Sequence, residues 1–250
     1  MSRAQINWLI GDSLPEHVAL LEAVPGVGNV GKLVVDALVE NNPSALIARI
    51  LHPDMPPHST LDKDGLLAPP SMLVHRVMLS DGRYVVTVTG ELQPMTATGQ
   101  YEVAQAILEM AKSTPQLLVL AGLASEVEEK AIHVICADAR VRSNLQANDI
   151  EVSTSQPEAG MIGVAGLLVS LSSIHQVPAV ALVADTVGAS ADVIAADRLA
   201  GWIEEALGLP LGIDLDTTEE TARKLLASIE VSGSIEEHLG MPADADDFYV

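Results

Sequence analysis

The sequence predicts an α/β domain in three layers over residues 1–231, in which helices cover both faces of a central sheet. Apolar strand patterns alternate with amphipathic helix patterns through most of this range, which is typical of such folds. Several apolar runs are continuous, as expected for strands covered on both faces. A glycine-rich turn between one such run and a helix makes half of a βαβ unit. The remaining residues, 232–250, are predicted to form a hinge, a short helix and a flexible acidic tail.

The composition supports a large hydrophobic core without disulfides. Of the 250 residues 48% are hydrophobic and only 2% are aromatic, so aliphatic side chains must fill the core. The single cysteine, Cys136, cannot form a disulfide within the chain. We therefore expect a reducing compartment, and the cytoplasm is the simplest choice.

The charge argues against two classes of partner. The chain has 34 acidic and 13 basic residues, for a net charge of −21, and such a surface repels nucleic acid and anionic lipid. The most apolar region, residues 160–184, is divided by polar residues and Pro178 into a helix and a strand, each too short to cross a bilayer. No nucleic-acid or membrane partner is therefore expected. The acidic surface fits a salt-rich cytoplasm or a basic partner equally well.

The first predicted strand, Ile6–Ile10, is followed by Gly11-Asp12-Ser13-Leu14. These four residues match the signature of an esterase family in which the serine is the nucleophile. That family also needs an Asp-x-x-His pair near the C-terminus, and the only late histidine, His238, has no aspartate three residues before it. Since Leu14-Pro15-Glu16 follows Ser13, we predict that Ser13 is the N-cap of a helix.

The turn at residues 25–32 follows the apolar run 18–24 and leads into a helix with an apolar stripe. Gly26-x-Gly28-x-x-Gly31 matches the dinucleotide fingerprint, and Gly26-x-x-x-x-Gly31-Lys32 matches most of a P-loop. In both patterns, glycines allow backbone N–H groups at a helix N-terminus to bind phosphate.

Each pattern lacks the residue that would make it specific. Position 33 is Leu where a P-loop has a hydroxyl for magnesium. The next strand, 45–51, ends in His52-Pro53 where dinucleotide-binding folds have an acid for the ribose. The favoured interpretation is a structural turn that permits close packing of helix on sheet, with no cofactor. The alternative is a nucleotide- or dinucleotide-binding enzyme that uses Gly26, Gly28, Gly31 and Lys32.

The segment from His52 to Pro70 holds five prolines, too many for regular structure. His52, Asp54 and His58 are possible metal ligands, but they lack the short fixed spacing of a strong site. A surface loop is the favoured interpretation, and no metal is expected. Loops of this length are often functional, and we predict that this one contacts another subunit.

The middle of the chain predicts a hairpin, a helix and a buried strand. Ser80-Asp81-Gly82 joins the apolar runs 73–79 and 83–89 and is a strong hairpin signal. A helix is expected over 99–112 and a strand over 116–122. The buried face of that helix is predicted to hold Tyr101, Ala104, Leu108 and Ala111.

The last third of the chain predicts two strands and several helices. Strands are expected at 132–137 and 178–184, and helices at 138–147, from Gly160 to Leu171, at 193–207 and after the capping box Thr217-x-x-Glu220. The spacing of Gly160, Gly163 and Gly166 is expected to let another backbone approach the helix closely. Ser190 stands one residue short of a serine-hydrolase elbow, and we predict that it caps the helix that follows.

Two segments resemble the proteasome assembly chaperone family of archaea and bacteria. They are residues 23–33, Ala-Val-Pro-Gly-Val-Gly-Asn-Val-Gly-Lys-Leu, and residues 90–94, Gly-Glu-Leu-Gln-Pro. Residues 99–101 and 160–168 look like later blocks of the same family, and only Ala23, where the family has glycine, departs from the first block. The resemblance implies a fold like that of nucleoside phosphorylases, a homo-oligomer, no cofactor and no catalysis.

The last three residues, Phe248-Tyr249-Val250, match a motif with which some archaeal members of that family end: a hydrophobic residue, Tyr and any residue. The resemblance implies that this tail binds the α-ring of the core proteasome. We therefore expect a non-catalytic proteasome-binding protein, an assembly chaperone or an activator. The competing hypotheses are the nucleotide-binding enzyme and a hydrolase that uses Ser13 or Ser190, and neither has a use for this tripeptide.

Overall fold

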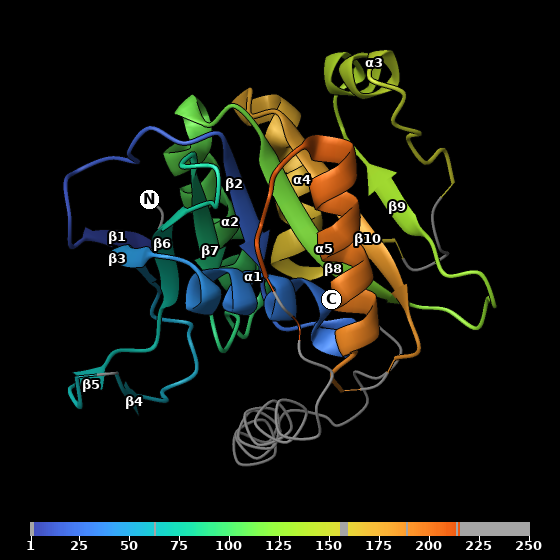
Figure 1. Cartoon of the computed structure of the whole chain (residues 1–250). Helices are drawn as coiled ribbons and strands as arrows, with labels where there is room; N and C mark the ends of the chain where they lie inside the picture. The colour runs from blue at the N-terminus through green and yellow to red at the C-terminus, as the bar shows by residue number, and fades with distance from the viewer. Residues whose placement is uncertain (1–2, 63, 156–159, 189, 214, 216–250) are drawn as a thin grey trace.

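The computed structural model describes residues 3–62, 64–155, 160–188, 190–213 and 215, and its central feature is an eight-stranded mixed sheet (Figure 1). In chain order its strands are β1 (Gln5–Trp8), β2 (Ala19–Ala23), β3 (Ser44–Leu51), β6 (Met72–Met78), β7 (Tyr84–Thr89), β8 (Leu117–Ala124), β9 (Ile132–Ile135) and β10 (Ala179–Thr186). Their order across the sheet is β1-β3-β6-β7-β2-β8-β10-β9. The central strands β7, β2, β8 and β10 are parallel, and the outer pairings are antiparallel.

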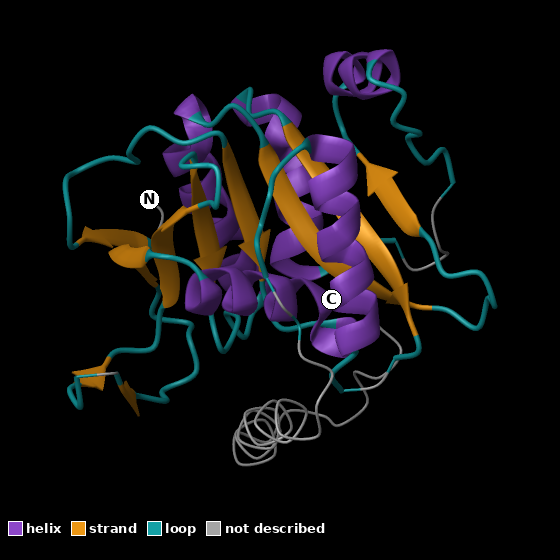
Figure 2. Ribbon diagram, viewed as in Figure 1, coloured by secondary structure: helices purple, strands orange, loops and turns teal. Residues whose placement is uncertain are grey.

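Helices cover both faces of this sheet, as Figure 2 shows. Helices α1 (Val30–Asn41) and α5 (Val193–Leu207) pack on one face, and α2 (Ala97–Met110) and α4 (Gly163–His175) pack on the other. The short helix α3 (Ala139–Ala147) follows the edge strand β9. The predicted α/β fold with a central sheet is therefore confirmed for the described residues.

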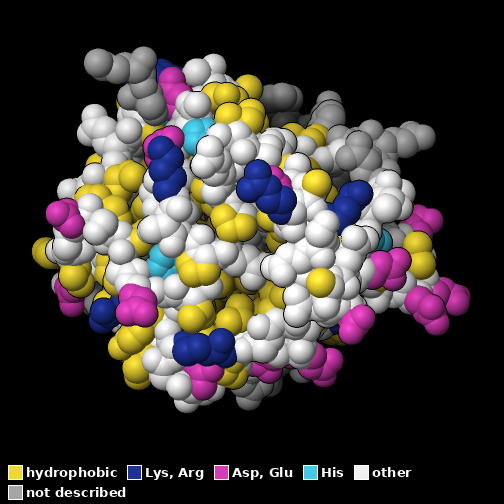
Figure 3. All heavy atoms as spheres, turned by 90° about the horizontal axis from the view of Figure 1, so that it is seen from above, with side chains coloured by type: hydrophobic (Ala, Val, Ile, Leu, Met, Phe, Trp, Pro, Cys, Tyr) yellow, Lys and Arg dark blue, Asp and Glu magenta, His cyan; other side chains and the backbone are white. Residues whose placement is uncertain are grey.

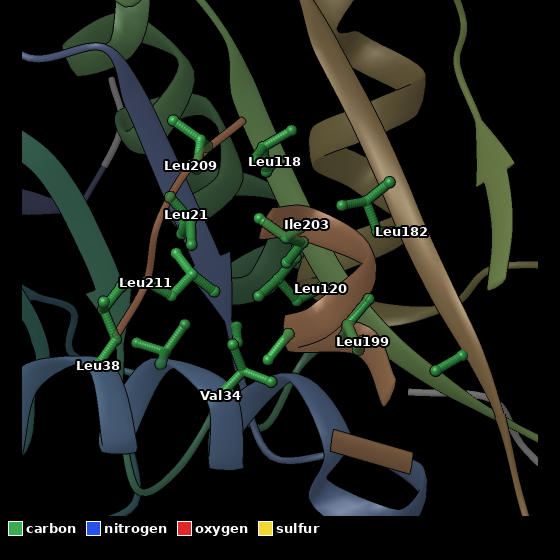
Figure 4. Packing of buried hydrophobic residues seen from close by; sticks show 14 of the residues in the cluster. Leu21, Val34, Leu38, Leu118, Leu120, Leu182, Leu199, Ile203, Leu209 and Leu211 are labelled. Carbon is green, nitrogen blue, oxygen red and sulfur yellow. The ribbon is translucent and has the colours of Figure 1, made fainter. Parts of the chain in front are cut away.

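Each face of the sheet has its own hydrophobic core. Figure 4 shows the one between the sheet and helices α1 and α5, where Leu21, Leu118 and Leu182 of the strands meet Val34 and Ile203 of the helices. Every residue of β2 and of β10 is buried, as expected for strands covered on both sides. Burying a leucine of this kind contributes about 1.5–3 kcal/mol relative to leaving it exposed.

The chain returns across this core after α5. Gly208, in the left-handed region at φ +61°, ends the helix as glycine commonly does. Leu209, Leu211 and Leu215 are then buried in the α1–α5 core. The side-chain amide of Asn42 donates to the carbonyl oxygens of Leu38 and Leu211, at 3.1 and 2.9 Å, and so ties the end of α1 to this return segment.

The helix predicted after Ser13 is absent, because no helix lies between β1 and β2. Ser13 is exposed, and its hydroxyl donates to Asp12 Oδ1 at 3.3 Å. The ring of His17 is hydrogen-bonded to the Pro15 carbonyl and to Thr114 Oγ1, at 2.6 and 2.9 Å. These bonds hold the segment as a turn that feeds directly into β2, so the N-cap prediction for Ser13 is wrong.

Three predictions about the helices also need correction. Tyr101 is 42% exposed and lies outside the buried stripe of α2, whereas Ala104, Leu108 and Ala111 are buried as predicted, together with Val103 and Ile107. Helix α4 begins at Gly163, so Gly160 lies outside it. A Cβ on Gly166 would approach the Met161 carbonyl, so the close approach is made by the chain just before the helix.

The segment 52–70 contains regular structure that its prolines did not suggest. A two-stranded hairpin, β4 (Thr60–Leu61) and β5 (Leu67–Ala68), pairs antiparallel and projects from the body at the lower left of Figure 1, below β1 and β3 in that view. The predicted helix after Thr217, the hinge and the tail lie outside the described residues. Within the described residues, no helix is long and apolar enough to cross a membrane.

Candidate functional site

The glycine-rich turn lies at the carboxyl end of the central strand β2, between β2 and α1. Gly28 and Asn29 are both in the left-handed region, at φ +65° and +48°. The Asn29 side chain fixes the turn: its Oδ1 accepts from the Gly26 amide at 3.2 Å, and its Nδ2 donates to the Ser190 carbonyl at 2.8 Å. The Asn29 side chain therefore stabilises the turn from within and also ties it to the segment that precedes α5.

Glycines at this turn make room for other parts of the same chain. A Cβ on Gly28 would lie 2.7 Å from Thr186 Oγ1, and one on Gly31 would overlap the Leu120 carbonyl of β8. Gly122, on β8 itself, faces the Val27 carbonyl equally closely. The turn and the first residues of α1 thus rest directly on β8 and on the end of β10. This geometry favours the structural interpretation over the phosphate-binding one.

Asp192 joins this turn to the N-terminus of α5. Its carboxylate accepts from the Ala195 amide at 2.9 Å, from Thr186 Oγ1 at 2.6 Å and from the Val187 amide at 3.1 Å. Its own amide donates to the Gly28 carbonyl at 2.8 Å. Burial acts to raise the pKa of Asp192, but these hydrogen bonds outweigh it and hold that pKa below its ordinary value. The N-cap of α5 is therefore Asp192, and the prediction that Ser190 caps this helix is wrong.

Lys32, the lysine of the P-loop-like pattern, is engaged by acids of its own chain. Its side chain is 11% exposed, and its ammonium lies 2.7 Å from Asp36 Oδ2 and 3.1 Å from Glu91 Oε1. Burial lowers the pKa of Lys32, but the two carboxylates more than offset this and raise it. For Asp36 burial dominates, and its pKa is raised despite the lysine. A phosphate could recruit Lys32 only by separating these two ion pairs.

The possible metal ligands in the loop after β3 fasten that loop to α2. The buried ring of His52 contacts Glu102 Oε2 through Nε2 at 2.8 Å and accepts from the Asp54 amide through Nδ1 at 3.1 Å. Asp54 Oδ2 accepts from the amide and hydroxyl of Thr96. Hydrogen bonds from His52 and from the Arg3 amide lower the pKa of Glu102 to about 2. In the described part of the chain, no three His, Cys, Asp or Glu side chains are placed to hold a metal ion.

The two candidate nucleophiles take part in different contacts. Ser13 donates to Asp12, and Ser190 contributes its carbonyl to Asn29. Neither contact brings a histidine to a serine hydroxyl, so the geometry does not favour a hydrolase.

A residue that the sequence interpretation passed over is Glu22, in the middle of β2. It is fully buried, and neither carboxylate oxygen has a hydrogen-bond partner among the described residues. Burial raises the pKa of Glu22 to about 8, so the group is mostly protonated at neutral pH. The signal was available, since Glu22 is the one acid within the apolar run 18–24.

On the face seen in Figure 3, the basic side chains do not form a cluster. There the Lys and Arg side chains lie apart from one another, with acidic and hydrophobic side chains between them. The predicted partner-binding residues Phe248, Tyr249 and Val250 lie outside the described residues, so the structure does not place them.

Comparison with known sequences identifies one family and one relative. The model of the PAC2 family matches residues 20–231. An uncharacterized protein of Methanocaldococcus jannaschii, MJ1210, is 24% identical over 220 residues, which cover 86% of this chain and 83% of that protein.

Comparison with solved structures identifies the same fold in two proteins of Pyrococcus furiosus. PbaA, an archaeal homologue of proteasome-assembly chaperone, is matched with a TM-score of 0.68 and 18% identity, over 94% of this chain and 96% of that one. PbaB, an archaeal proteasome activator, is matched with a TM-score of 0.69 and 20% identity, over 94% of this chain and 100% of that one. Because the sequence identities are only 18% and 20%, this structural similarity shows a shared fold alone.

Proposed function

The chain belongs to the PAC2 family, and from this premise we propose that it is a non-catalytic proteasome-binding protein. It docks its C-terminal tail into the α-ring of the core proteasome and acts there as an assembly chaperone or an activator. It works in the cytoplasm as a homo-oligomer and needs no cofactor. The finding that carries the proposal is the tripeptide Phe248-Tyr249-Val250 on a chain with this fold.

Each residue of the tripeptide has a distinct task in this proposal. Phe248 buries an apolar side chain between α-subunits, for a gain of about 2 kcal/mol. Tyr249 adds ring packing and a hydroxyl hydrogen bond, and the Val250 carboxylate pairs with a basic residue of the pocket. Ordering a flexible segment offsets much of this gain, so one tail binds weakly. Several tails on one oligomer raise the affinity through effective concentration.

The last residue that the structure describes, Leu215, is buried in the α1–α5 core. The ten residues after Gly240 can span at most about 35 Å. This length allows the tripeptide to reach a pocket from a body lying over the ring.

The direct test is a binding assay with purified core proteasome and the full chain, compared with a chain that lacks residues 248–250. Tyr249→Ala and a tag fused after Val250 should both abolish binding and leave the circular dichroism spectrum and the oligomer unchanged. Tyr101→Ala is the matched control, because Tyr101 is an exposed tyrosine on α2 with no part in the proposal. Full-strength binding by the tagged chain would show that the tail is not the anchor.

A further inference from the structure

Three exposed apolar side chains lie at the carboxyl end of the parallel strands. Val127, Val187 and Ile194 are 59%, 72% and 72% exposed. Val127 follows β8, Val187 follows β10, and Ile194 lies in the first turn of α5, all toward the lower right of Figure 1. This is the end at which open α/β sheets bind their ligands, and exposed apolar side chains that gather there mark a contact surface. We name these three residues the apolar triad.

Hydrogen bonds join the three segments that carry the apolar triad. The Ser125 amide donates to the carbonyl of the last residue of β10 at 3.0 Å, and the Val127 amide donates to Ser125 Oγ at 3.3 Å. The Asp192 carboxylate accepts from the amides of Val187 and Ala195, and so ties the end of β10 to the first turn of α5. The backbone under the triad is therefore ordered before a partner binds, which lowers the entropic cost of binding.

Acidic side chains surround the apolar triad, and the bases beside them are already engaged. The exposed acids lie in the loop after β8 and in the first turns of α5: Glu126, Glu128, Glu129 and Asp197. Lys130 and Arg198 are the two basic residues of these described segments. Lys130 donates to the Ser125 carbonyl, and Arg198 donates to the Asp185 carbonyl. The triad therefore presents apolar contact area within a negative local field.

We propose that the apolar triad binds a segment of a partner protein that combines apolar with basic side chains. The apolar side chains of the segment cover Val127, Val187 and Ile194, and its Lys or Arg side chains face the surrounding glutamates. The apolar contact supplies most of the affinity, whereas the charges select the partner and speed its association. This site is separate from the C-terminal tripeptide and goes beyond the proposed function.

Charge complementarity selects this occupant among the alternatives. The acids repel nucleic acid and anionic lipid surfaces. A second copy of the chain brings the same net charge of −21, and the acidic C-terminal tail of the chain itself is repelled for the same reason. A basic segment without apolar side chains would leave the triad uncovered. A segment that is both basic and apolar matches the triad and its surroundings.

The experiment measures fluorescence anisotropy of short labelled peptides with the full chain. In the first peptide lysine alternates with leucine, in the second with serine, and in the third glutamate alternates with leucine. We expect the natural chain to bind the Lys-Leu peptide at least about tenfold more tightly than the Lys-Ser peptide. The Glu-Leu peptide should not bind. Absence of binding by the Lys-Leu peptide, or equal binding of all three, would overturn the proposal.

A first pair of variants tests the apolar contact. Val187→Ser with Ile194→Ser should weaken binding of the Lys-Leu peptide at least about tenfold. The matched control is Leu61→Ser with Leu67→Ser, because these leucines are 68% and 70% exposed and lie in the β4–β5 hairpin. The control should bind like the natural chain. An equal loss in both variants would show that the peptide responds to exposed apolar surface in general, against the proposal.

A second pair of variants tests the charges at constant net charge. Glu126→Gln with Glu128→Gln should weaken binding at least about threefold at low salt and make it less sensitive to added salt. The control is Asp12→Asn with Glu16→Gln, two exposed acids before β2, which removes the same amount of charge elsewhere. Equal effects of the two variants would show that only the net charge matters, and the assignment of the site would be wrong.

Three further measurements identify the occupant and separate the two proposals. Urea unfolding of each variant reports whether the fold is kept. Sedimentation of the serine variant of Val187 and Ile194 should match the natural chain, and a loss of self-association would make a second copy the occupant instead. A chain that lacks residues 248–250 should still bind the Lys-Leu peptide, and the serine variant should still bind the core proteasome. Either proposal can therefore fail alone.

Discussion

At the residue scale, the most consequential group is the carboxyl of Glu22. A polar group buried without a hydrogen bond lowers stability, and a charged one would lower it far more, so the protein keeps this carboxyl protonated. Its pKa moves from 4.5 to about 8 on folding. Between these values the folded chain holds a proton that the unfolded chain has lost, so the free energy of unfolding falls as the pH rises.

Glu22→Gln should remove this pH dependence. The amide cannot ionise, so the variant should gain stability over the natural chain as the pH rises from 5 to 9, by about 4 kcal/mol. Urea unfolding at several pH values measures the difference. Glu40→Gln, at an exposed position of α1, is the control and should follow the natural chain. Parallel curves for Glu22→Gln and the natural chain would contradict the prediction.

A substitution of Lys32 can distinguish the structural interpretation of the turn from the nucleotide-binding interpretation. Lys32→Met keeps the apolar stem but leaves Asp36 without its partner, so we expect a loss of stability of about 1–3 kcal/mol. By calorimetry, neither ATP nor NAD should bind the natural chain. Micromolar binding of either nucleotide that disappears in Lys32→Met would instead support the enzyme hypothesis.

At the element scale, the fold depends on how closely α1 approaches β8. Gly31 faces the Leu120 carbonyl with no room for a side chain, so helix and strand meet backbone to backbone. Gly201, in the middle of α5, has nothing within 4 Å of an added Cβ. The two glycines lie in helices that pack on the same face of the sheet. Substitution by alanine should nevertheless change stability in opposite directions at the two positions.

Gly31→Ala should push α1 away from the sheet and cost at least about 3 kcal/mol. Gly201→Ala should stabilise the protein by about 0.5–1 kcal/mol, because alanine is the better helix former. Urea unfolding measures both changes. Equal effects of the two substitutions would show that Gly31 does not set the distance between α1 and β8.

Elements were predictable from the sequence where one local pattern decided them. The helix after the glycine turn, the hairpin at Ser80-Asp81-Gly82 and the buried strands at 116–122 and 178–184 are all present, because periodicity and turn chemistry agree there. Ser13 and Ser190 failed as helix caps because a tertiary contact, through His17 and Asp192, determined the local structure. Glu91, the second partner of Lys32, comes from the segment after β7, and Glu22 is buried because β7 and β8 pair on either side of β2. No local pattern encodes either arrangement.

At the scale of the whole molecule, the charge affects two kinds of association in opposite ways. Copies of a chain with a net charge of −21 repel each other, and added salt screens this repulsion. The acidic tail, with Asp244, Asp246 and Asp247, would be attracted to a basic pocket, and salt screens that attraction as well.

Raising the salt concentration should therefore strengthen self-association and weaken binding of the tail to the core proteasome. Light scattering measures the first and a surface binding assay measures the second. If salt changed self-association and tail binding in the same direction, either the repulsion between copies or the attraction of the tail to a basic pocket would be wrong. The predicted domain boundary at residue 231 and the nucleoside-phosphorylase-like fold remain predictions.

The position of β2 has a consequence for synthesis of the chain. This strand leaves the ribosome early, but the strands on either side of it, β7 and β8, begin only at Tyr84 and Leu117. The nascent chain thus carries an unpaired apolar strand for a long interval, a state prone to aggregation. During that interval Glu22 is exposed and ionised, and a charge within an apolar segment hinders aggregation. The carboxyl that destabilises the finished fold would protect the growing chain, and its proton is taken up when the neighbouring strands arrive.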